Sequence, residues 1–240
     1  MRLLLLSNST NYGSGYLDHA AGEIADHFAG VGRILFVPFA LHDQQGYWEI
    51  ARRRFAAFGI EVDRLEAGPD APAAVENAAG IFVGGGNTFR LLDLLQRARV
   101  VEPIRRRVAG GMPYLGSSAG TVVASPTIRT TNDMPIVFPA SFDALGLVPF
   151  QINCHYLDPD PASRHMGETR ERRLMEFLED NDAVVIGLRE GAMLRVEGPA
   201  GGGALEVELR GTAGARLFRR GSEPTEHRPG DALGEILISR

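Results

Sequence analysis

The sequence predicts an α/β fold: a mostly parallel, doubly wound sheet flanked by helices, with antiparallel hairpins at the C-terminal end. Two observations support this fold class. Short apolar runs typical of buried parallel strands alternate with segments of helical spacing along most of the chain. After Leu188 the pattern changes to short alternating stretches between glycine-rich turns. No long linker and no repeat of fixed period interrupts the 240 residues, so we expect a single domain over residues 1–240.

The individual elements follow from the same patterns. The apolar runs predict strands at residues 3–6, 34–38, 81–84, 113–116 and 183–188. Apolar residues at helical spacing predict helices at residues 16–28, 48–58 and 88–98, and a later helix is expected at residues 168–179. Alternating stretches predict hairpin strands, added to the same sheet, at residues 193–196, 204–209 and 215–218.

Composition excludes several classes of function. The formal net charge is −5, which provides no basic surface for a nucleic acid or an anionic membrane. All 25 residues counted as Lys or Arg are arginine, so Schiff-base chemistry and a Ser-Lys dyad are excluded. The lone Cys154 cannot form an intrachain disulfide, and we expect a reducing, cytoplasmic location. The apolar run at residues 3–6 is too short for a signal peptide or a membrane span.

The strongest local motif is G-x-S-x-G at residues 116–120, between a predicted strand and a helix-compatible segment. A strand-to-helix turn this tight strains its central residue and needs very small neighbours two positions away. Gly116 and Gly120 meet that need, and the turn would expose the hydroxyl of Ser118 at the carboxyl edge of the sheet. The N–H of Ala119 could then stabilise an oxyanion. A structural glycine-serine turn without chemistry would carry the same pattern.

A second glycine-rich loop, residues 84–88, follows the strand predicted at residues 81–84. Its backbone N–H groups have no side chains in the way, and we expect Gly86 to supply the second donor of an oxyanion hole. A phosphate or dinucleotide loop is the rival interpretation. The G-x-G-x-x-G spacing and a Walker lysine are both absent from the sequence, which weakens it.

A serine nucleophile needs a base, usually histidine, and an acid that orients it. His155 ends an apolar run at residues 148–154 and is the preferred base, with His165 as a lesser alternative. Two carboxylates are candidates for the acid: Glu190, which follows the strand at residues 183–188, and Asp133, in a polar loop after the nucleophile helix. Spacing alone does not rank these two.

Several segments together form a longer pattern. They are residues 3–10, 83–89, 118–120, 126–137, 151–153, 155, 167–171, 185–188 and 190–191. In this order they resemble the peptidase E family, the S51 serine peptidases, over nearly the whole chain. The resemblance implies a fold like that of class I glutamine amidotransferases, with serine in place of their cysteine. It also implies hydrolysis of Asp-Xaa dipeptides without a metal or cofactor.

Carried over by position, the resemblance makes Ser118 the nucleophile and His155 the base, and it leaves Asp133 and Glu190 both open as the acid. Small departures at Ser117 and Cys154 are expected to affect the shape of the pocket more than its chemistry. A small peptide is the expected partner, and the sequence fits both a monomer and a homodimer.

Recognition of an aspartate side chain requires a fixed cation, ideally the planar fork of arginine. Arg170 at the start of the helix at residues 168–179 is the first candidate, and Arg129 is the second. Asn87 could bind the same carboxylate or the substrate backbone.

Two other functions fit parts of the pattern. A cyanophycinase-like hydrolase shares the elbow and attacks β-aspartyl-arginine peptides, although the compact length favours the dipeptidase. A non-catalytic sensor of acidic peptides would keep the pocket and lose the chemistry.

Overall fold

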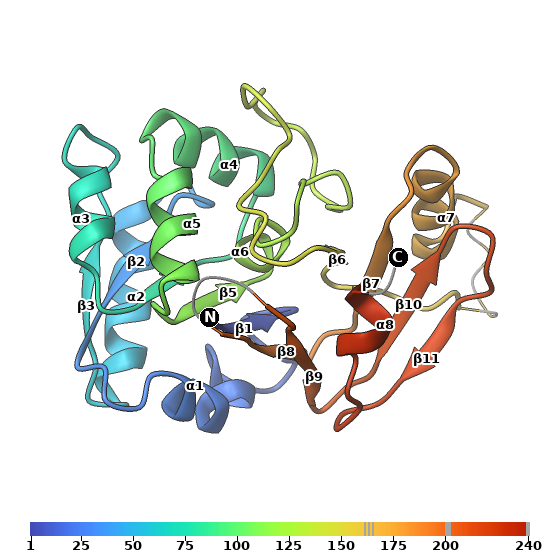
Figure 1. Cartoon of the computed structure of the whole chain (residues 1–240), viewed down its shortest axis with the longest axis horizontal. Coiled ribbons are helices and arrows are strands. Elements are labelled where there is room, and N and C mark those ends of the chain that lie inside the picture. Colours follow the sequence, from blue (N-terminus) through green and yellow to red (C-terminus); the bar gives the residue numbers. More distant parts are fainter. Residues whose placement is uncertain (161, 163, 165, 200–202, 239–240) are drawn as a thin grey trace.

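The computed structural model describes residues 1–160, 162, 164, 166–199 and 203–238 (Figure 1). Over these residues the strands form two sheets. The larger sheet has seven strands in the order β3-β2-β4-β5-β1-β8-β9, and the smaller has four in the order β11-β10-β7-β6. In Figure 1 the larger sheet and its helices lie on the left and the smaller sheet lies on the right.

The larger sheet has a parallel part and an antiparallel edge. Its strands are β1 (Arg2–Leu6), β2 (Arg33–Val37), β3 (Glu61–Arg64), β4 (Ile81–Val83), β5 (Tyr114–Ser117), β8 (Ala192–Glu197) and β9 (Glu206–Gly211). Strands β1 to β5 pair in parallel, and β8 joins the free edge of β1 in the antiparallel direction. β1 is therefore central, and Leu6 lies opposite Ser117 on one side and Met193 on the other.

Helices cover both faces of the larger sheet, because alternate residues of its central strand point to opposite sides. Leu4 and Leu6 of β1 belong to one buried cluster, with residues of α1 (Ala21–His27) and α2 (Gln44–Ala56). Leu3 and Leu5 belong to the other cluster, which includes residues of α3 (Ala71–Asn77), α4 (Thr88–Arg97), α5 (Val101–Ala109) and α6 (Ala119–Val122). A short 3-10 helix, η1 (Asp18–Ala20), precedes α1. The predicted α/β class with a mostly parallel, doubly wound sheet is confirmed.

The smaller sheet lies between the main core and one helix. It consists of β6 (Gln151–Asn153), β7 (Val184–Leu188), β10 (Ala215–Arg219) and β11 (Thr225–His227), and its helix is α7 (Arg170–Asp180). Ile186 of β7 packs in the main core, whereas its neighbour Val185 packs with Leu174 and Leu178 of α7. The last helix is α8 (Gly234–Ile238). Because alternate residues of β7 point to opposite faces, one face of the smaller sheet packs in the main core and the other packs against α7.

Sheet membership differs from the sequence prediction at two strands. The strand at residues 183–188 was expected in the main sheet, and the hairpin strand at residues 215–218 was expected to extend it. In the structure they are β7 and β10 of the smaller sheet, where β7 pairs in parallel with β6. The physical reason is that β8 occupies the free edge of β1, so the main sheet has no edge beside β1 for β7. The hairpin strands β8 and β9 do extend the main sheet, as predicted.

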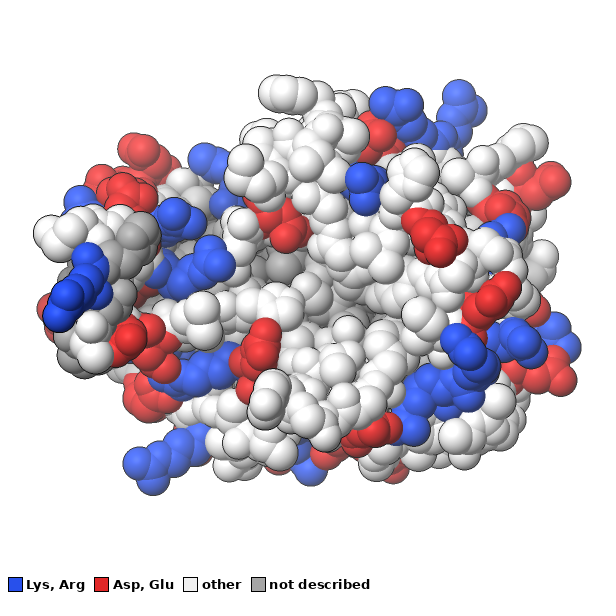
Figure 2. All heavy atoms as spheres, turned by 180° about the vertical axis from the view of Figure 1, so that it is seen from behind, with Lys and Arg blue, Asp and Glu red and all other residues white. Residues whose placement is uncertain are grey.

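The surface carries charges of both signs. On the face shown in Figure 2, acidic and basic side chains are interspersed around a largely uncharged centre. Among the described residues, no helix combines the length and the apolar character needed to span a bilayer.

Burial of His27 at the end of α1 predicts a loss of stability in mild acid. The residue is 3% exposed and its ring meets Phe28 edge-on. Burial, together with the charges of Arg2 and Arg195, lowers the pKa of His27 to about 3. In the unfolded chain this histidine has an ordinary pKa of about 6.5. Between about pH 3 and pH 6.5 the unfolded chain therefore binds a proton at His27 that the folded chain does not bind.

The resulting stabilisation is complete above about pH 6.5 and is lost as the pH falls toward 3. We expect His27 to account for about 2 kcal/mol of lost unfolding free energy between pH 7 and pH 5. Urea unfolding of the wild type and of His27→Gln at both pH values measures this, with exposed His42→Gln as the control. An equal loss in wild type and His27→Gln would contradict it.

Candidate active site

Ser118 occupies the tight turn between β5 and α6. Its backbone has φ 50° and ψ −110°, a conformation that L residues rarely adopt. Two glycines permit the turn: a Cβ atom on Gly116 would lie 2.6 Å from the Gly120 carbonyl oxygen, and one on Gly120 would lie 2.0 Å from that of Val83. The Ser118 N–H donates to the carbonyl oxygen of Leu6 at 3.0 Å, which ties the turn to β1. The strand–turn–helix geometry expected for G-x-S-x-G is present.

His155 faces this serine from the other sheet. It follows β6 by two residues, and its Nε2 lies 2.9 Å from Ser118 Oγ. His155 also has a positive φ, 54°. With the ring hydrogen on Nδ1, Nε2 is free to accept the serine proton. The alternative base, His165, lies outside the described residues.

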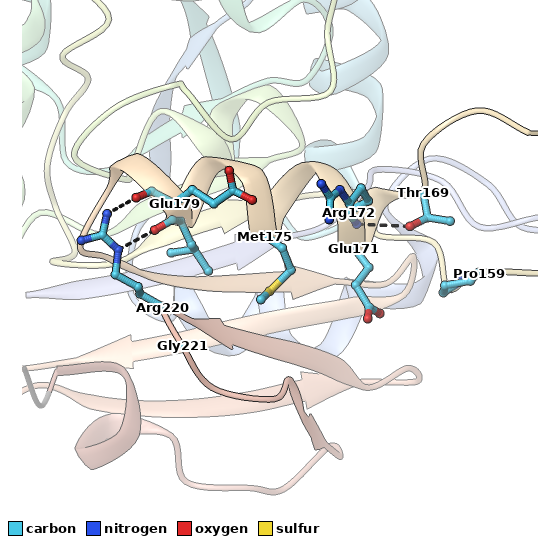
Figure 3. Close-up of a pocket in the computed structure, with 9 residues that line it drawn as sticks. Pro159, Thr169, Glu171, Arg172, Met175, Glu179, Arg220 and Gly221 are labelled. Carbon is cyan, nitrogen blue, oxygen red and sulfur yellow. Dashed lines mark hydrogen bonds between the residues drawn. The ribbon is translucent and has the colours of Figure 1, made fainter.

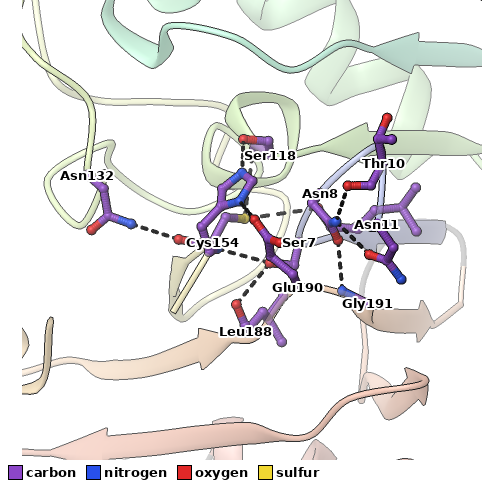
Figure 4. Close-up of polar contacts among 12 residues, drawn as sticks. Ser7, Asn8, Thr10, Asn11, Ser118, Asn132, Cys154, Leu188, Glu190 and Gly191 are labelled. Atoms are coloured by element: carbon purple, nitrogen blue, oxygen red, sulfur yellow. Dashed lines mark hydrogen bonds and ion pairs between the residues drawn. The ribbon is translucent and has the colours of Figure 1, made fainter. Parts of the chain in front are cut away.

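Of the two candidate acids, the structure brings Glu190 to the imidazole. Glu190 Oε1 lies 2.8 Å from His155 Nδ1, so Glu190, His155 and Ser118 form one hydrogen-bonded line (Figure 4). Asp133 is bound elsewhere: its Oδ2 accepts the N–H of Thr88 at 2.7 Å and the Thr88 hydroxyl at 2.5 Å, at the start of α4. Asp133, the other of the two candidate acids, therefore makes no hydrogen bond to the His155 ring.

The histidine–glutamate pair is open to solvent. The side chain of His155 is 40% exposed and that of Glu190 is 54% exposed. Exposed ion pairs contribute little to folding stability, because water screens them and both side chains lose freedom. The pair is therefore better suited to fixing the direction and tautomer of the imidazole than to holding the fold together.

Two backbone N–H groups next to Ser118 are free to bind an oxyanion. Within the described chain, the amides of Gly86 and Ala119 have no hydrogen-bond acceptor, whereas the Gly85 N–H donates to the Tyr47 hydroxyl at 2.8 Å. The loop lies against the elbow, since a Cβ atom on Gly85 would come within 3.1 Å of Ser118 Cβ. Gly86 has φ 133°, and a Cβ atom there would lie 2.7 Å from the Ala40 carbonyl oxygen. The N–H groups of Gly86 and Ala119, which the sequence predicts as the oxyanion donors, are therefore available to bind an oxyanion.

Comparison with known proteins decides the family. The family model described as "Peptidase family S51" matches residues 3–201. The chain belongs to peptidase family S51. Two relatives of this S51 chain extend the match. "Peptidase E" of Streptomyces coelicolor is 53% identical over 240 residues, covering 100% of this chain and 96% of the relative. A Drosophila melanogaster protein named "Probable alpha-aspartyl dipeptidase" is 49% identical over 220 residues, covering 90% of this chain and 89% of the relative.

A solved structure supports the fold of this S51 member. The crystal structure of a peptidase from an acI-B1 actinobacterium superposes with a TM-score of 0.72 at 18% sequence identity, covering 97% of this chain and 96% of that one. At that identity the likeness concerns the fold. The predicted S51 resemblance, the α/β fold class and the prediction of a hydrolase of the peptidase class are confirmed.

Arg170 and Asp133 form a second, charged part of the S51 site. Arg170 is half-buried in the first turn of α7 and makes no hydrogen bond or ion pair with any residue that the structure describes. Burial and the charge of Arg173 lower the pKa of Arg170, and the negative charge of Asp133 opposes them. Both hydrogen bonds of the Asp133 carboxylate reach Oδ2, so its Oδ1 has no hydrogen-bond donor among the described residues. A cationic and an anionic group therefore lie near each other with unused binding capacity.

The structure gives the other two substrate candidates local partners. The side chain of Asn87 caps α4 by accepting the Arg90 N–H at 3.1 Å, and its amide donates to the Met134 carbonyl oxygen at 2.9 Å. Asn87 was predicted to bind substrate, but its side-chain oxygen and amide nitrogen both already bond to other residues of the protein.

Arg129 is exposed and donates to Asn181 Oδ1 at 2.6 Å, just before β7 begins, with its guanidinium over the Phe177 ring. Glu190 follows the opposite end of β7, a strand that spans about 16 Å. The expectation that Arg129 binds substrate beside the triad is corrected, because the fold directs it to the other end of the smaller sheet.

A cavity of about 400 Å³ lies between α7 and the turn at Arg220 and Gly221, away from the Ser118–His155–Glu190 line (Figure 3). Thr169, Met175, Arg220 and other side chains line it, and none of them belongs to the Ser118–His155–Glu190 line (Figure 3). Arg220 closes one end of it by donating to the Leu178 carbonyl oxygen at 2.8 Å at the end of α7. Within the described chain, no three His, Cys, Asp or Glu side chains are grouped to hold a metal ion.

Three residues near the site were not singled out as site residues from the sequence. Tyr47 holds the Gly85 loop, and Ser7 and Asn8 follow β1 directly. The signal for the last two was available: polar residues after a buried strand, at the sheet edge where the other site residues were placed. For Tyr47 no local signal exists, because its hydroxyl reaches the loop across 38 positions of sequence.

Proposed function

We propose that this S51 member is a serine dipeptidase that hydrolyses Asp-Xaa dipeptides through an acyl-enzyme on Ser118. The observation that carries the proposal is the line from Glu190 Oε1 through the imidazole of His155 to Ser118 Oγ, with separations of 2.8 and 2.9 Å. That line ends on a strained elbow beside two free amides, which is the arrangement that acyl transfer needs. The names of the two relatives, "Peptidase E" and "Probable alpha-aspartyl dipeptidase", support the same reaction class.

The reaction proceeds in two halves. Ser118 Oγ attacks the carbonyl carbon of the substrate aspartate while His155 Nε2 takes the hydroxyl proton, and the amides of Gly86 and Ala119 stabilise the oxyanion. His155 then gives the proton to the leaving amine, the peptide bond breaks, and an aspartyl ester remains on Ser118. Water, deprotonated by His155, attacks this ester and releases aspartate. Glu190 keeps the hydrogen of the ring on Nδ1 throughout.

Charge complementarity selects the aspartate. Arg170 binds the β-carboxylate of the substrate, because it is half-buried and has no hydrogen-bond or ion-pair partner among the described residues. An unpaired, partly buried cation is costly, and the more so in the first turn of a helix, where the dipole is already positive. Asp133 Oδ1 binds the α-ammonium group, which restricts the enzyme to the free N-terminus of its substrate. The lone cysteine is buried, which supports a cytoplasmic location.

A substrate panel with Arg170→Gln tests this assignment. We expect the wild type to cleave Asp-Leu in preference to Asn-Leu, and Arg170→Gln to lose about 100- to 1,000-fold in kcat/KM for Asp-Leu, with little change for Asn-Leu. Arg172→Gln, which removes an exposed arginine of the same helix, is the matched control and keeps the preference. Equal losses on both substrates would reject Arg170 as the carboxylate ligand.

The same panel separates the alternatives. Turnover of β-Asp-Arg in place of Asp-Leu would favour a cyanophycinase-like hydrolase. Binding of Asp-Leu without any turnover would favour a sensor of acidic peptides.

A further inference from the structure

The three residues of the proposed triad come from two different sheets. Ser118 follows β5 of the seven-stranded sheet, whereas His155 and Glu190 follow β6 and β7 of the four-stranded sheet. The distance between nucleophile and base therefore depends on how the ends of β6 and β7 are held against the end of β1, the strand that pairs with β5. Two consecutive residues, Ser7 and Asn8, lie at that junction.

Ser7 joins the base to both sheets. Its hydroxyl accepts the His155 N–H at 3.0 Å and donates to the carbonyl oxygen of Leu188, the last residue of β7, at 2.9 Å. Its own N–H extends the main sheet by donating to the Ala192 carbonyl oxygen at 3.0 Å. Ser7 is fully buried, so water does not compete for these bonds. The bond to His155 also restrains a backbone held at positive φ, which would otherwise relax.

Asn8 holds the segment that carries the acid, Glu190. Its Oδ1 accepts the N–H of Gly191, the residue after Glu190, at 2.8 Å. Its Nδ2 donates to the Thr10 carbonyl oxygen at 2.9 Å and to Asn11 Oδ1 at 2.7 Å, so the amide cannot rotate without breaking a bond. Asn8 is 2% exposed, and Gly191 has φ 87°.

We propose that Ser7 and Asn8 are positioning residues for catalysis: Ser7 sets the place of the base and Asn8 sets the place of the acid. This inference rests on the proposed function of the same site. Neither side chain contacts the reacting atoms, and each acts through the backbone of the triad segment that it holds. Small displacements matter here, because proton transfer requires Nε2 and Oγ to stay within hydrogen-bond reach.

Ser7→Ala and Asn8→Ala test the inference in the full chain. We expect each to lower kcat for Asp-Leu by roughly 10- to 100-fold while KM stays within about twofold. The rate at which a fluorophosphonate labels Ser118 falls by a similar factor, because labelling depends on the same serine–histidine contact. In Asn8→Ala the downfield proton signal of the His155 Nδ1–H bond to Glu190 weakens or disappears.

Val75→Ala is the matched control for lost stability. Val75 is fully buried in α3, away from the second sheet, so its truncation lowers the melting temperature without touching the triad. Measurements are made well below the melting temperature of each variant. If Ser7→Ala does not fold, Asn8→Ala decides the question.

The inference is overturned if folded Ser7→Ala or Asn8→Ala keeps wild-type kcat and labelling, or if Val75→Ala loses kcat to the same extent. Labelling separates this result from a failure of the proposed function. A wild type that labels at Ser118 but does not cleave Asp-Leu would contradict the proposed substrate class. The positioning role would then be decided by comparing the labelling rates of the wild type and the two variants. A wild type that neither labels nor cleaves would overturn both.

Discussion

Ser118→Ala is expected to lower kcat for Asp-Leu by about five to six orders of magnitude, because the variant has no atom that can form the acyl-enzyme. The residual rate would come from the Gly86 and Ala119 amides and from substrate binding. The fold should persist, since alanine adds no atom to the turn and the Ser118 N–H bond to Leu6 belongs to the backbone.

Steady-state kinetics and thermal unfolding check this expectation. Ser117→Ala is a matched control, because it removes the hydroxyl of the preceding residue, which is fully buried and has no hydrogen-bond partner in the described chain. We expect that control to retain turnover within about tenfold, a loss far smaller than that of a nucleophile. A Ser118→Ala protein that cleaves Asp-Leu at the wild-type rate would reject Ser118 as the nucleophile.

Glu190→Gln is expected to lower kcat for Asp-Leu by about 100- to 10,000-fold, because a neutral amide neither fixes the imidazole tautomer nor stabilises the imidazolium formed during attack. The wide range reflects the exposure of Glu190, since water can replace part of its interaction with the ring. KM should change little, because Glu190 contacts the base and not the proposed substrate groups.

Asp133→Asn is the contrasting variant. Its amide oxygen can still accept the Thr88 N–H, so this bond at the start of α4 should persist, while the charge offered to the substrate ammonium is lost. We expect a raised KM with kcat within about tenfold of the wild type. The reverse pattern, with kcat lost in Asp133→Asn and kept in Glu190→Gln, would exchange the roles of the two carboxylates.

The elbow was predictable from the sequence because its cause is local. A turn this tight excludes side chains at Gly116 and Gly120, and the structure finds their neighbours within 2.6 and 2.0 Å of the missing Cβ atoms. The same holds for most strands, since buried runs such as β1 and β5 carry their apolar character in consecutive residues.

Features that depend on contacts between distant segments were not predictable. An apolar run at residues 183–188 predicts a strand but not its partner, and competition with β8 for the edge of β1 decided that it pairs with β6. Likewise, Asp133 and Glu190 both follow suitable elements, and they are distinguished by long-range contacts: Glu190 bonds to the His155 ring, whereas Asp133 accepts the Thr88 N–H. Arg129 was the second candidate for the substrate carboxylate, but the fold places it before the start of β7, at the opposite end of that strand from Glu190.

Active-site titration with a fluorophosphonate, followed by peptide mapping, tests the central claim most directly. The account predicts one adduct per chain, on Ser118, formed in step with the loss of Asp-Leu turnover and slowed when Asp-Leu is present. An adduct on a different residue that abolishes turnover in the same proportion would contradict it.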